Sequence, residues 1–315
     1  MTQIYDLIII GAGPAGLTAA LYALRARMNI LVIDKAGTGG QALIIDNIEN
    51  FPGFSENSSG FVWVEKIETQ LKQFDFNVKA ESVKSISPGE YMTVITDQNS
   101  YQTDAIICST GAEPKKIGVK GEQEFVGKGV SYCATCDGPF FKNKHVVVVG
   151  GGDTAVKDAL VLTRFAHKIT LVHRRDRLRA EKIMQEQLLS SSQVTVEWNS
   201  SVSEIKGSTK VEKIKLTNIK TNNTKDLSCD GVFVLIGITP ATAFLQGLVK
   251  TDSQGFIETN AHMETSKPGI FAAGDCRIQL LRQIITACGD GATAAYAAQH
   301  YVDAKKGKAY GEFKP

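Results

Sequence analysis

The sequence has no long uninterrupted hydrophobic run and little net charge. Its 315 residues include 35 Lys and Arg against 33 Asp and Glu, a formal net charge of +2, whereas a dedicated nucleic-acid-binding protein usually carries a strongly basic face. The longest apolar stretch, residues 7–24, is interrupted by glycines and Pro14 and follows Asp6 rather than basic residues, unlike a signal sequence or membrane span. We therefore expect a soluble, cytoplasmic protein without a nucleic-acid or membrane partner.

Cysteine and histidine are also scarce, which restricts the kinds of site that the chain can form. A small disulfide scaffold would be denser in cysteine, and a zinc site would need a second CxxC or a close histidine pair. The six cysteines are residues 108, 133, 136, 229, 276 and 288, and the five histidines show no ligand spacing. We expect no metal, so the closely spaced pair Cys133 and Cys136 consists of either inert thiols or a redox pair.

One motif occurs twice in the chain. The segments 6–34 and 145–173 align without a gap, and each reads as an apolar strand, a glycine turn, a helix and a second β-branched strand. The turns Gly11-x-Gly13-x-x-Gly16 and Gly150-x-Gly152-x-x-Ala155 lie where strand becomes helix. This pattern is typical of a dinucleotide-binding β-α-β unit, in which the helix N-terminus receives a pyrophosphate.

The two copies differ where the ribose of a dinucleotide would lie. The first ends at Asp34, a carboxylate that can accept hydrogen bonds from ribose hydroxyls but repels a 2′-phosphate. The second ends at His173 and continues with Arg174, Arg175 and Arg179. Arginine binds phosphate by charge-assisted, often bidentate hydrogen bonds. The second copy therefore predicts an NADPH site, although a solvated basic segment is the alternative.

A second signature identifies the other dinucleotide as FAD. The segment Thr265 to Asp275, "TSKPGIFAAGD", has the threonine, apolar strand and Gly-Asp ending found in FAD-containing reductases. We expect an α/β protein with two Rossmann-like domains, the NADPH domain being inserted into a discontinuous FAD domain. The predicted ranges are 1–113 and 245–315 for FAD and 114–244 for NADPH. The proline-containing segments 109–115 and 237–244 are the expected crossings.

The cysteine pair lies just before the first strand of the NADPH domain. The spacing of Cys133 and Cys136 allows one disulfide, which reduced FAD can open with two electrons. Asp137 follows immediately and can exchange a proton with a thiolate. The neighbouring aromatic residues Phe140 and Phe141 fit either a docking patch or packing under the next strand.

Seven motifs in this order resemble the low-molecular-weight, bacterial-type thioredoxin reductases over essentially the whole chain. They are "GAGPAG", "GGQ" (39–41), "CATCDG", "GGGDTA", "HRRDRLRAEK", "FAAGD" and "RQ" (282–283). The resemblance implies a flavoenzyme that reduces thioredoxin with electrons from NADPH. It implies a homodimer, Cys136 next to the flavin, Cys133 as the thiol that attacks thioredoxin, and Asp137 as the acid.

The resemblance and the glycine motifs together assign the cofactor residues. Those expected at FAD are Gly11, Gly13, Pro14, Ala15, Gly16, Asp34, Gly40, Gln41, Asn50, Thr110, Gly111, Gly274, Asp275, Arg282 and Gln283. Those expected at NADPH are Gly150, Gly152, Asp153, Thr154, Ala155, His173, Arg174, Arg175 and Arg179. In the family the NADPH domain rotates against the FAD domain, and residues 113–114 and 239–240 are the hinge candidates.

One segment departs from the family, and two other functions compete. Ile238 and Ala241 stand where many members have His and Asn, which concerns cofactor handling or domain motion. A related flavoenzyme could use ferredoxin as donor or oxygen as acceptor, although neither has reason to keep the arginine cluster. A non-catalytic dinucleotide sensor would have no reason to keep Cys133, Cys136 and Asp137 together.

Overall fold

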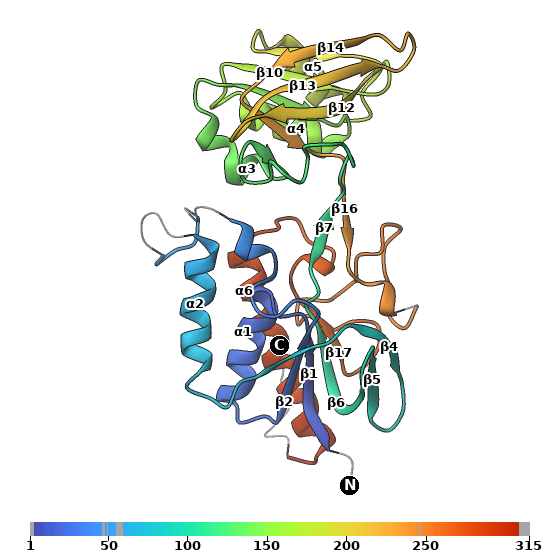
Figure 1. Ribbon diagram of the computed structural model, residues 1–315. Coiled ribbons are helices and arrows are strands. Elements are labelled where there is room, and N and C mark those ends of the chain that lie inside the picture. The colour runs from blue at the N-terminus through green and yellow to red at the C-terminus, as the bar shows by residue number, and fades with distance from the viewer. Residues whose placement is uncertain (1–2, 46–47, 49, 55–58, 246, 309–315) are drawn as a thin grey trace. The chain divides into compact units, whose positions relative to one another are not determined.

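The chain divides into two compact units. The computed structural model describes residues 3–45, 48, 50–54, 59–245 and 247–308. Unit 1 comprises residues 1–113 and 239–315, and unit 2 comprises residues 114–238 (Figure 1). The chain returns to unit 1 at residue 239, earlier than the 245 expected from the sequence. The reason is that β16 (Ile238–Pro240) pairs with β7 (Ala112–Pro114), so both crossings are made within one strand pair.

Unit 1 is built on a sheet with the order β3-β2-β1-β6-β5-β4, in which β17 also pairs with β6. The central strands are parallel and read as continuous apolar runs because both of their faces are buried. Since β17 comes from the C-terminal part of the chain, both parts of unit 1 share this sheet. The strands are β1 (Ile4–Ile10), β2 (Ile30–Asp34), β3 (Val78–Ala80), β4 (Val83–Ser87), β5 (Met92–Thr96), β6 (Ser100–Cys108) and β17 (Ile270–Ala272).

Small residues let two helices of unit 1 pack closely. Helix α1 (Pro14–Arg25) begins with proline at its first position, where the missing N–H costs nothing. A Cβ on Gly291 of α6 (Ile284–Lys305) would lie 2.1 Å from the Ala15 carbonyl oxygen, so glycine is required there. The remaining helices of this unit are α2 (Gly60–Leu71) and the short turns η1 (Gly40–Ile44), η3 (Ala243–Leu245) and η4 (Gly274–Cys276).

Unit 2 repeats the same plan around a parallel sheet with the order β11-β10-β9-β15-β8. Its strands are β8 (Val130–Ser131), β9 (His145–Val149), β10 (Lys168–Val172), β11 (Val194–Glu197) and β15 (Gly231–Val234). Its helices are α3 (Ala134–Asp137), η2 (Gly138–Phe141), α4 (Asp153–Leu162) and α5 (Lys182–Ser190). An antiparallel sheet of β12 (Ser200–Gly207), β13 (Val211–Asn218) and β14 (Thr224–Ser228) completes it. The β1-α1-β2 and β9-α4-β10 units confirm the predicted Rossmann-like repeat.

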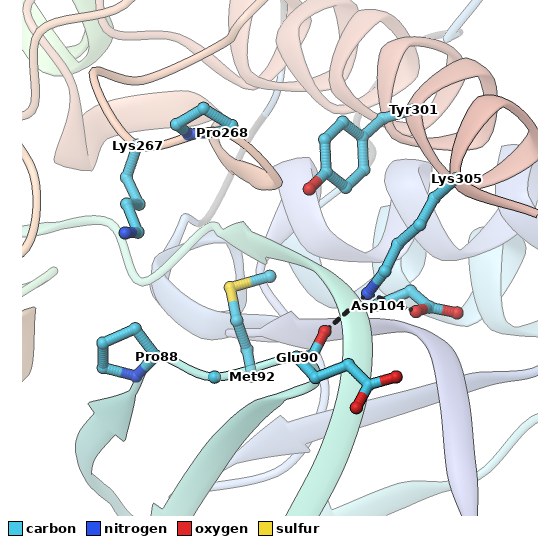
Figure 2. A pocket seen from close by; sticks show the side chains of 9 residues that line it. Pro88, Glu90, Met92, Asp104, Lys267, Pro268, Tyr301 and Lys305 are labelled. Atoms are coloured by element: carbon cyan, nitrogen blue, oxygen red, sulfur yellow. Dashed lines mark hydrogen bonds and ion pairs between the residues drawn. The ribbon is translucent and has the colours of Figure 1, made fainter.

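The C-terminal end of α6 is fixed by an ion pair beside a small cavity (Figure 2). The Lys305 Nζ lies 2.7 Å from a carboxylate oxygen of Asp104, which is 4% exposed, and donates to the Glu90 carbonyl oxygen. The cavity has a volume of about 250 Å³, and none of the predicted site residues lines it. The Lys305–Asp104 ion pair is therefore a structural contact within unit 1. No helix within the described residues has the length and apolar composition to cross a membrane.

Candidate functional site

The glycines of the first turn serve two purposes. Gly11 has φ of +105°, and a Cβ there would lie 2.4 Å from the Ser109 carbonyl oxygen. A Cβ on Gly16 would lie 1.8 Å from the Gly11 carbonyl oxygen. Protein packing therefore requires both residues to be glycine. Gly13 differs, because nothing lies within 4 Å of its Cβ position.

The turn in unit 2 has the same division. A Cβ on Gly150 would lie 2.5 Å from the Cβ of Ala155, whereas nothing lies within 4 Å of the Cβ position of Gly152. Gly13 and Gly152 are the N-caps of α1 and α4, and neither helix has a side-chain cap. Both turns therefore leave open space beside uncapped backbone amides. A diphosphate group can approach such amides, so both turns fit a dinucleotide cofactor.

Substitution of Gly152 by Ala separates cofactor binding from folding. The φ of −95° suits alanine, and the gain from restricting the unfolded chain offsets the poorer N-cap, so the free energy of unfolding should stay within about 1 kcal/mol of the wild type. We expect NADPH affinity, measured by calorimetry, to fall at least about tenfold, because the methyl group would fill the open space beside the α4 amides where a diphosphate is expected. Gly13→Ala is the matched variant and should weaken FAD retention instead. Unchanged NADPH affinity in Gly152→Ala would contradict this assignment.

The residue that ends the second strand reaches back to the glycine turn in both units. In unit 1 the Ala12 N–H donates to the Asp34 carboxylate at 2.8 Å. In unit 2 the Nδ1–H of His173 donates to the Gly150 carbonyl oxygen at 3.0 Å, and a Cβ on Gly151 would lie 2.1 Å from that ring nitrogen. His173 is only 5% exposed, and burial lowers its pKa. His173 therefore supports the glycine turn, and its predicted place at the NADPH site stays a prediction.

The arginines that follow are available to a ligand. Arg174, Arg175 and Arg179 are exposed, and so are Asp153 and Thr154 at the start of α4. The Arg179 N–H donates to the Gly151 carbonyl oxygen at 2.7 Å, which ties this loop to the glycine turn. A further exposed arginine of the same loop, Arg177, was not among the predicted residues.

Several of the predicted FAD residues meet around the turn of unit 1. A Cβ on Gly40 would lie 3.2 Å from the Gly13 Cα, so the 39–41 segment lies against that turn. The Gln41 amide donates to the Ala112 carbonyl oxygen. The Thr110 hydroxyl donates to the Ala241 carbonyl oxygen at 2.8 Å, and the Ala241 N–H donates to Gly111. The segment that departs from the family is thus fixed through its backbone.

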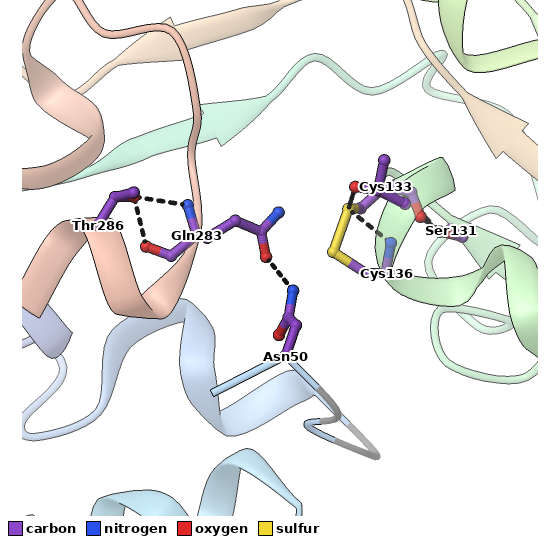
Figure 3. Close-up of a disulfide and its surroundings, with 7 residues drawn as sticks. Asn50, Ser131, Cys133, Cys136, Gln283 and Thr286 are labelled. Carbon is purple, nitrogen blue, oxygen red and sulfur yellow. Dashed lines mark hydrogen bonds between the residues drawn. A yellow bond between two sulfur atoms is a disulfide. The ribbon is translucent and has the colours of Figure 1, made fainter. Parts of the chain in front are cut away.

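A second group of predicted FAD residues lies near the beginning of α6. The Asn50 amide donates to the Gln283 Oε1 at 2.8 Å across a sequence separation of 233 residues (Figure 3). Gly274 has φ of +73°, and Asp275 follows it; burial raises the pKa of Asp275. The Arg282 Nε, together with the Oε1 of Gln279 beside Asp275, is buried without a hydrogen-bond partner among the described residues. Such atoms fit a polar ligand such as the flavin side chain.

Three structural residues around this site were not predicted. The buried Ser109 hydroxyl donates to the Gly11 carbonyl oxygen at 2.8 Å, and the Gly274 N–H donates to the Asp290 carboxylate at 3.0 Å. Asp290 also pairs with Arg277 through two hydrogen bonds of 2.7 and 2.8 Å. In the sequence, the Asp290–Arg277 pair is indicated only by a charged residue, Asp290, among the small and apolar residues of α6.

The predicted cysteine pair is a disulfide in unit 2 (Figure 3). Cys133 is the N-cap of α3, and its Sγ accepts a hydrogen bond from the Cys136 N–H at 3.2 Å. The Ser131 hydroxyl accepts from the Cys133 N–H at 3.1 Å. Asp137 ends α3, and its N–H donates to the Cys133 carbonyl oxygen at 3.1 Å. An amide directed at sulfur favours a thiolate at Cys133 when the bond is open.

Asp158 is a titratable neighbour of this helix that was not predicted as a site residue. It lies half-buried on α4, which packs against α3. Burial raises its pKa to about 6, and a hydrogen bond from the Ala134 backbone opposes this shift. A carboxyl group near the cysteine helix can therefore change its charge close to neutral pH.

Three of the other cysteines have the properties of inert thiols. Cys108, Cys229 and Cys276 are buried, and burial raises the pKa of Cys229 to about 12 and that of Cys276 to about 11. Phe141 packs edge-on against Phe233 with ring centroids 5.1 Å apart, which supports its packing role. Phe140, in contrast, is 46% exposed.

Comparison with known proteins agrees with this geometry. The sequence matches the family described as pyridine nucleotide-disulphide oxidoreductases over residues 5–291. The thioredoxin reductase of Treponema pallidum is 48% identical, covering 95% of this chain and 97% of that protein. The thioredoxin reductase of Bacillus subtilis is 47% identical, covering 96% of each. The crystal structure of thioredoxin reductase from Streptococcus pyogenes is 44% identical with a TM-score of 0.92, covering 96% of this chain and all of that one. The chain belongs to the pyridine nucleotide-disulphide oxidoreductase family and, within it, to the thioredoxin reductases.

Proposed function

We propose that this protein reduces the disulfide of thioredoxin with electrons from NADPH, passed through FAD to Cys133 and Cys136. The observation that carries the proposal is the Cys133–Cys136 disulfide at the N-terminus of α3, in the unit whose glycine turn is followed by exposed arginines. The family is one of FAD- and NADPH-dependent enzymes that act on a disulfide. Bound FAD supplies the two-electron chemistry that links a nicotinamide to a dithiol.

The cysteines have distinct parts in this proposal. The Cys133 thiolate attacks one sulfur of the thioredoxin disulfide, forming a mixed disulfide and releasing the other thioredoxin sulfur as a thiolate. The Cys136 thiolate then attacks Cys133, which reforms the disulfide of this chain and releases the second thioredoxin sulfur. Asp137 and solvent protonate the two released thiolates, so that thioredoxin becomes a dithiol.

We further propose that the active form is a cytoplasmic homodimer and that rotation of unit 2 alternates the two half-reactions. The paired crossing strands β7 and β16 support the placement of the hinge at residues 113–114 and 238–240. A related enzyme with ferredoxin as donor is the competing function. The exposed Arg174, Arg175 and Arg179 disfavour it, because a ferredoxin-dependent enzyme has no 2′-phosphate to bind.

An anaerobic mixing experiment tests the proposal directly. The purified holoenzyme is combined with NADPH or NADH, and flavin absorbance is followed before and after thioredoxin is added. We expect rapid bleaching by NADPH followed by formation of thioredoxin thiols. A flavin that stays oxidised with both nucleotides would overturn the proposed donor, and ferredoxin would then be tested. A flavin that bleaches without forming thioredoxin thiols would overturn the proposed acceptor.

A further inference from the structure

A buried carboxylate in unit 2 joins two segments that matter for the redox pair. Glu122 is 2% exposed and accepts three hydrogen bonds. Its Oε1 accepts from the Ile117 N–H at 2.9 Å and from the Tyr132 hydroxyl at 3.1 Å, and its Oε2 accepts from the Gly118 N–H at 2.7 Å. Three donors offset the cost of burying the carboxylate, so the arrangement is a specific one.

The first of these segments follows the crossing strands. The Lys115 N–H donates to the Gly237 carbonyl oxygen at 2.9 Å, which extends the pairing of β7 with β16 into unit 2. Ile117 and Gly118 follow it after one intervening residue, Lys116. By holding both of their amides, Glu122 fixes the point at which the entering chain joins unit 2.

The second segment is the approach to the redox cysteines. Tyr132 precedes Cys133 and follows β8, an edge strand of two residues that pairs only with β15 among the described strands. So short a strand makes few ladder hydrogen bonds, and the Ser131 hydroxyl, which accepts from the Cys133 N–H, adds one local contact. The Tyr132 ring packs against the core cluster that contains Phe125 and Val130, and its hydroxyl bond to Glu122 adds a directional restraint next to Cys133.

Glu122 itself has a firm support. It follows Gly121, which has φ of +85° and whose Cβ would lie 2.0 Å from the Ile205 carbonyl oxygen. The Ile205 N–H donates to the Lys120 carbonyl oxygen at 2.9 Å, so the 120–122 turn is attached to β12. The turn that carries the carboxylate is thus attached to the antiparallel sheet of unit 2.

We propose that Glu122 is a positioning residue for the redox pair: through the Tyr132 hydroxyl it restrains Cys133 and links it to the strand pair that enters unit 2. This role rests on the proposed function and deepens it, because it names the contact that positions Cys133 in the dithiol. The restraint limits the freedom of Cys133 in the open dithiol and so raises its effective concentration toward Cys136.

The test is the equilibrium between this disulfide and dithiothreitol in the holoenzyme. Two electrons and two protons from dithiothreitol open the Cys133–Cys136 bond, and dithiothreitol closes into its cyclic disulfide. The fractions are trapped with a thiol reagent and counted by mass spectrometry of the peptide that carries both cysteines. We expect Tyr132→Phe to lower the equilibrium constant for disulfide formation about three- to tenfold, the effect of losing one hydrogen bond of ordinary strength.

Tyr101→Phe is the matched control. The Tyr101 hydroxyl donates to another buried carboxylate, that of Glu81, at 2.8 Å in unit 1. This variant loses the same type of bond, so it should lose similar stability without changing the redox equilibrium more than about twofold. Equal shifts in both variants would show a general effect of stability and overturn the inference.

Glu122→Gln completes a double-mutant cycle. If the hydroxyl and carboxylate act together, the double variant should shift the equilibrium no more than the larger single variant. Additive shifts, or no shift in Tyr132→Phe, would overturn the inference. The measurement needs neither NADPH nor thioredoxin, so its failure and the failure of the proposed function are separate results.

Discussion

Replacement of Cys136 by Ser is expected to abolish thioredoxin reduction while NADPH still bleaches the flavin. Without Cys136 the mixed disulfide on Cys133 cannot be resolved within the chain, and the dithiol that carries the electrons to thioredoxin does not form. Turnover should fall by about three orders of magnitude or more, as when one member of a catalytic unit is removed. Stopped-flow absorbance measures flavin reduction, and a thiol assay on thioredoxin measures turnover.

Cys229→Ser is the matched control for this prediction. It makes the same substitution in the same unit at a buried cysteine outside α3. It should lower stability modestly and keep turnover, because a thiol whose pKa burial raises to about 12 is protonated at neutral pH. A Cys136→Ser variant that still turns over would remove this cysteine from the proposed reaction.

The repeat in the sequence predicted most of the fold. Both β-α-β units follow from local signals, since a strand, a glycine turn and a helix are determined within about thirty residues. The cysteine pair was predictable for the same reason. The inserted unit also followed from the order of motifs, although the return at residue 239 depends on pairing of β16 with β7, which no local pattern specifies.

The contacts that complete the site could not be predicted in this way. Asn50 meets Gln283, and Glu122 meets Tyr132, because folding brings together residues that no periodicity relates. The direction of the His173 side chain could not be predicted either. Its position at the end of the second strand assigned it to the NADPH site, whereas no sequence pattern indicated that its ring would be buried against Gly151 and hydrogen-bonded to the Gly150 carbonyl oxygen. Motif spacing predicts the strand, turn or helix to which a residue belongs, whereas the direction of its side chain depends on packing.

Replacement of Arg174 and Arg175 by Ala is expected to weaken NADPH far more than NADH. Both side chains are exposed at the end of β10, beside a loop that a backbone hydrogen bond ties to the glycine turn. Loss of two charge-assisted contacts to a 2′-phosphate costs about 2–4 kcal/mol, so KM for NADPH should rise about 30-fold or more. Steady-state kinetics with each nucleotide measures this difference.

The nucleotide comparison makes the result specific to the phosphate. NADH lacks the 2′-phosphate, so its KM should change less than about threefold in the same variant, and the preference for NADPH should largely disappear. Arg164→Ala, which removes an exposed arginine of unit 2 outside this cluster, should leave both values unchanged. Equal losses for NADPH and NADH would show that these arginines act through general charge or local folding. A selective loss would assign the nucleotide preference to two side chains that follow β10, at the position where unit 1 carries no arginine after Asp34.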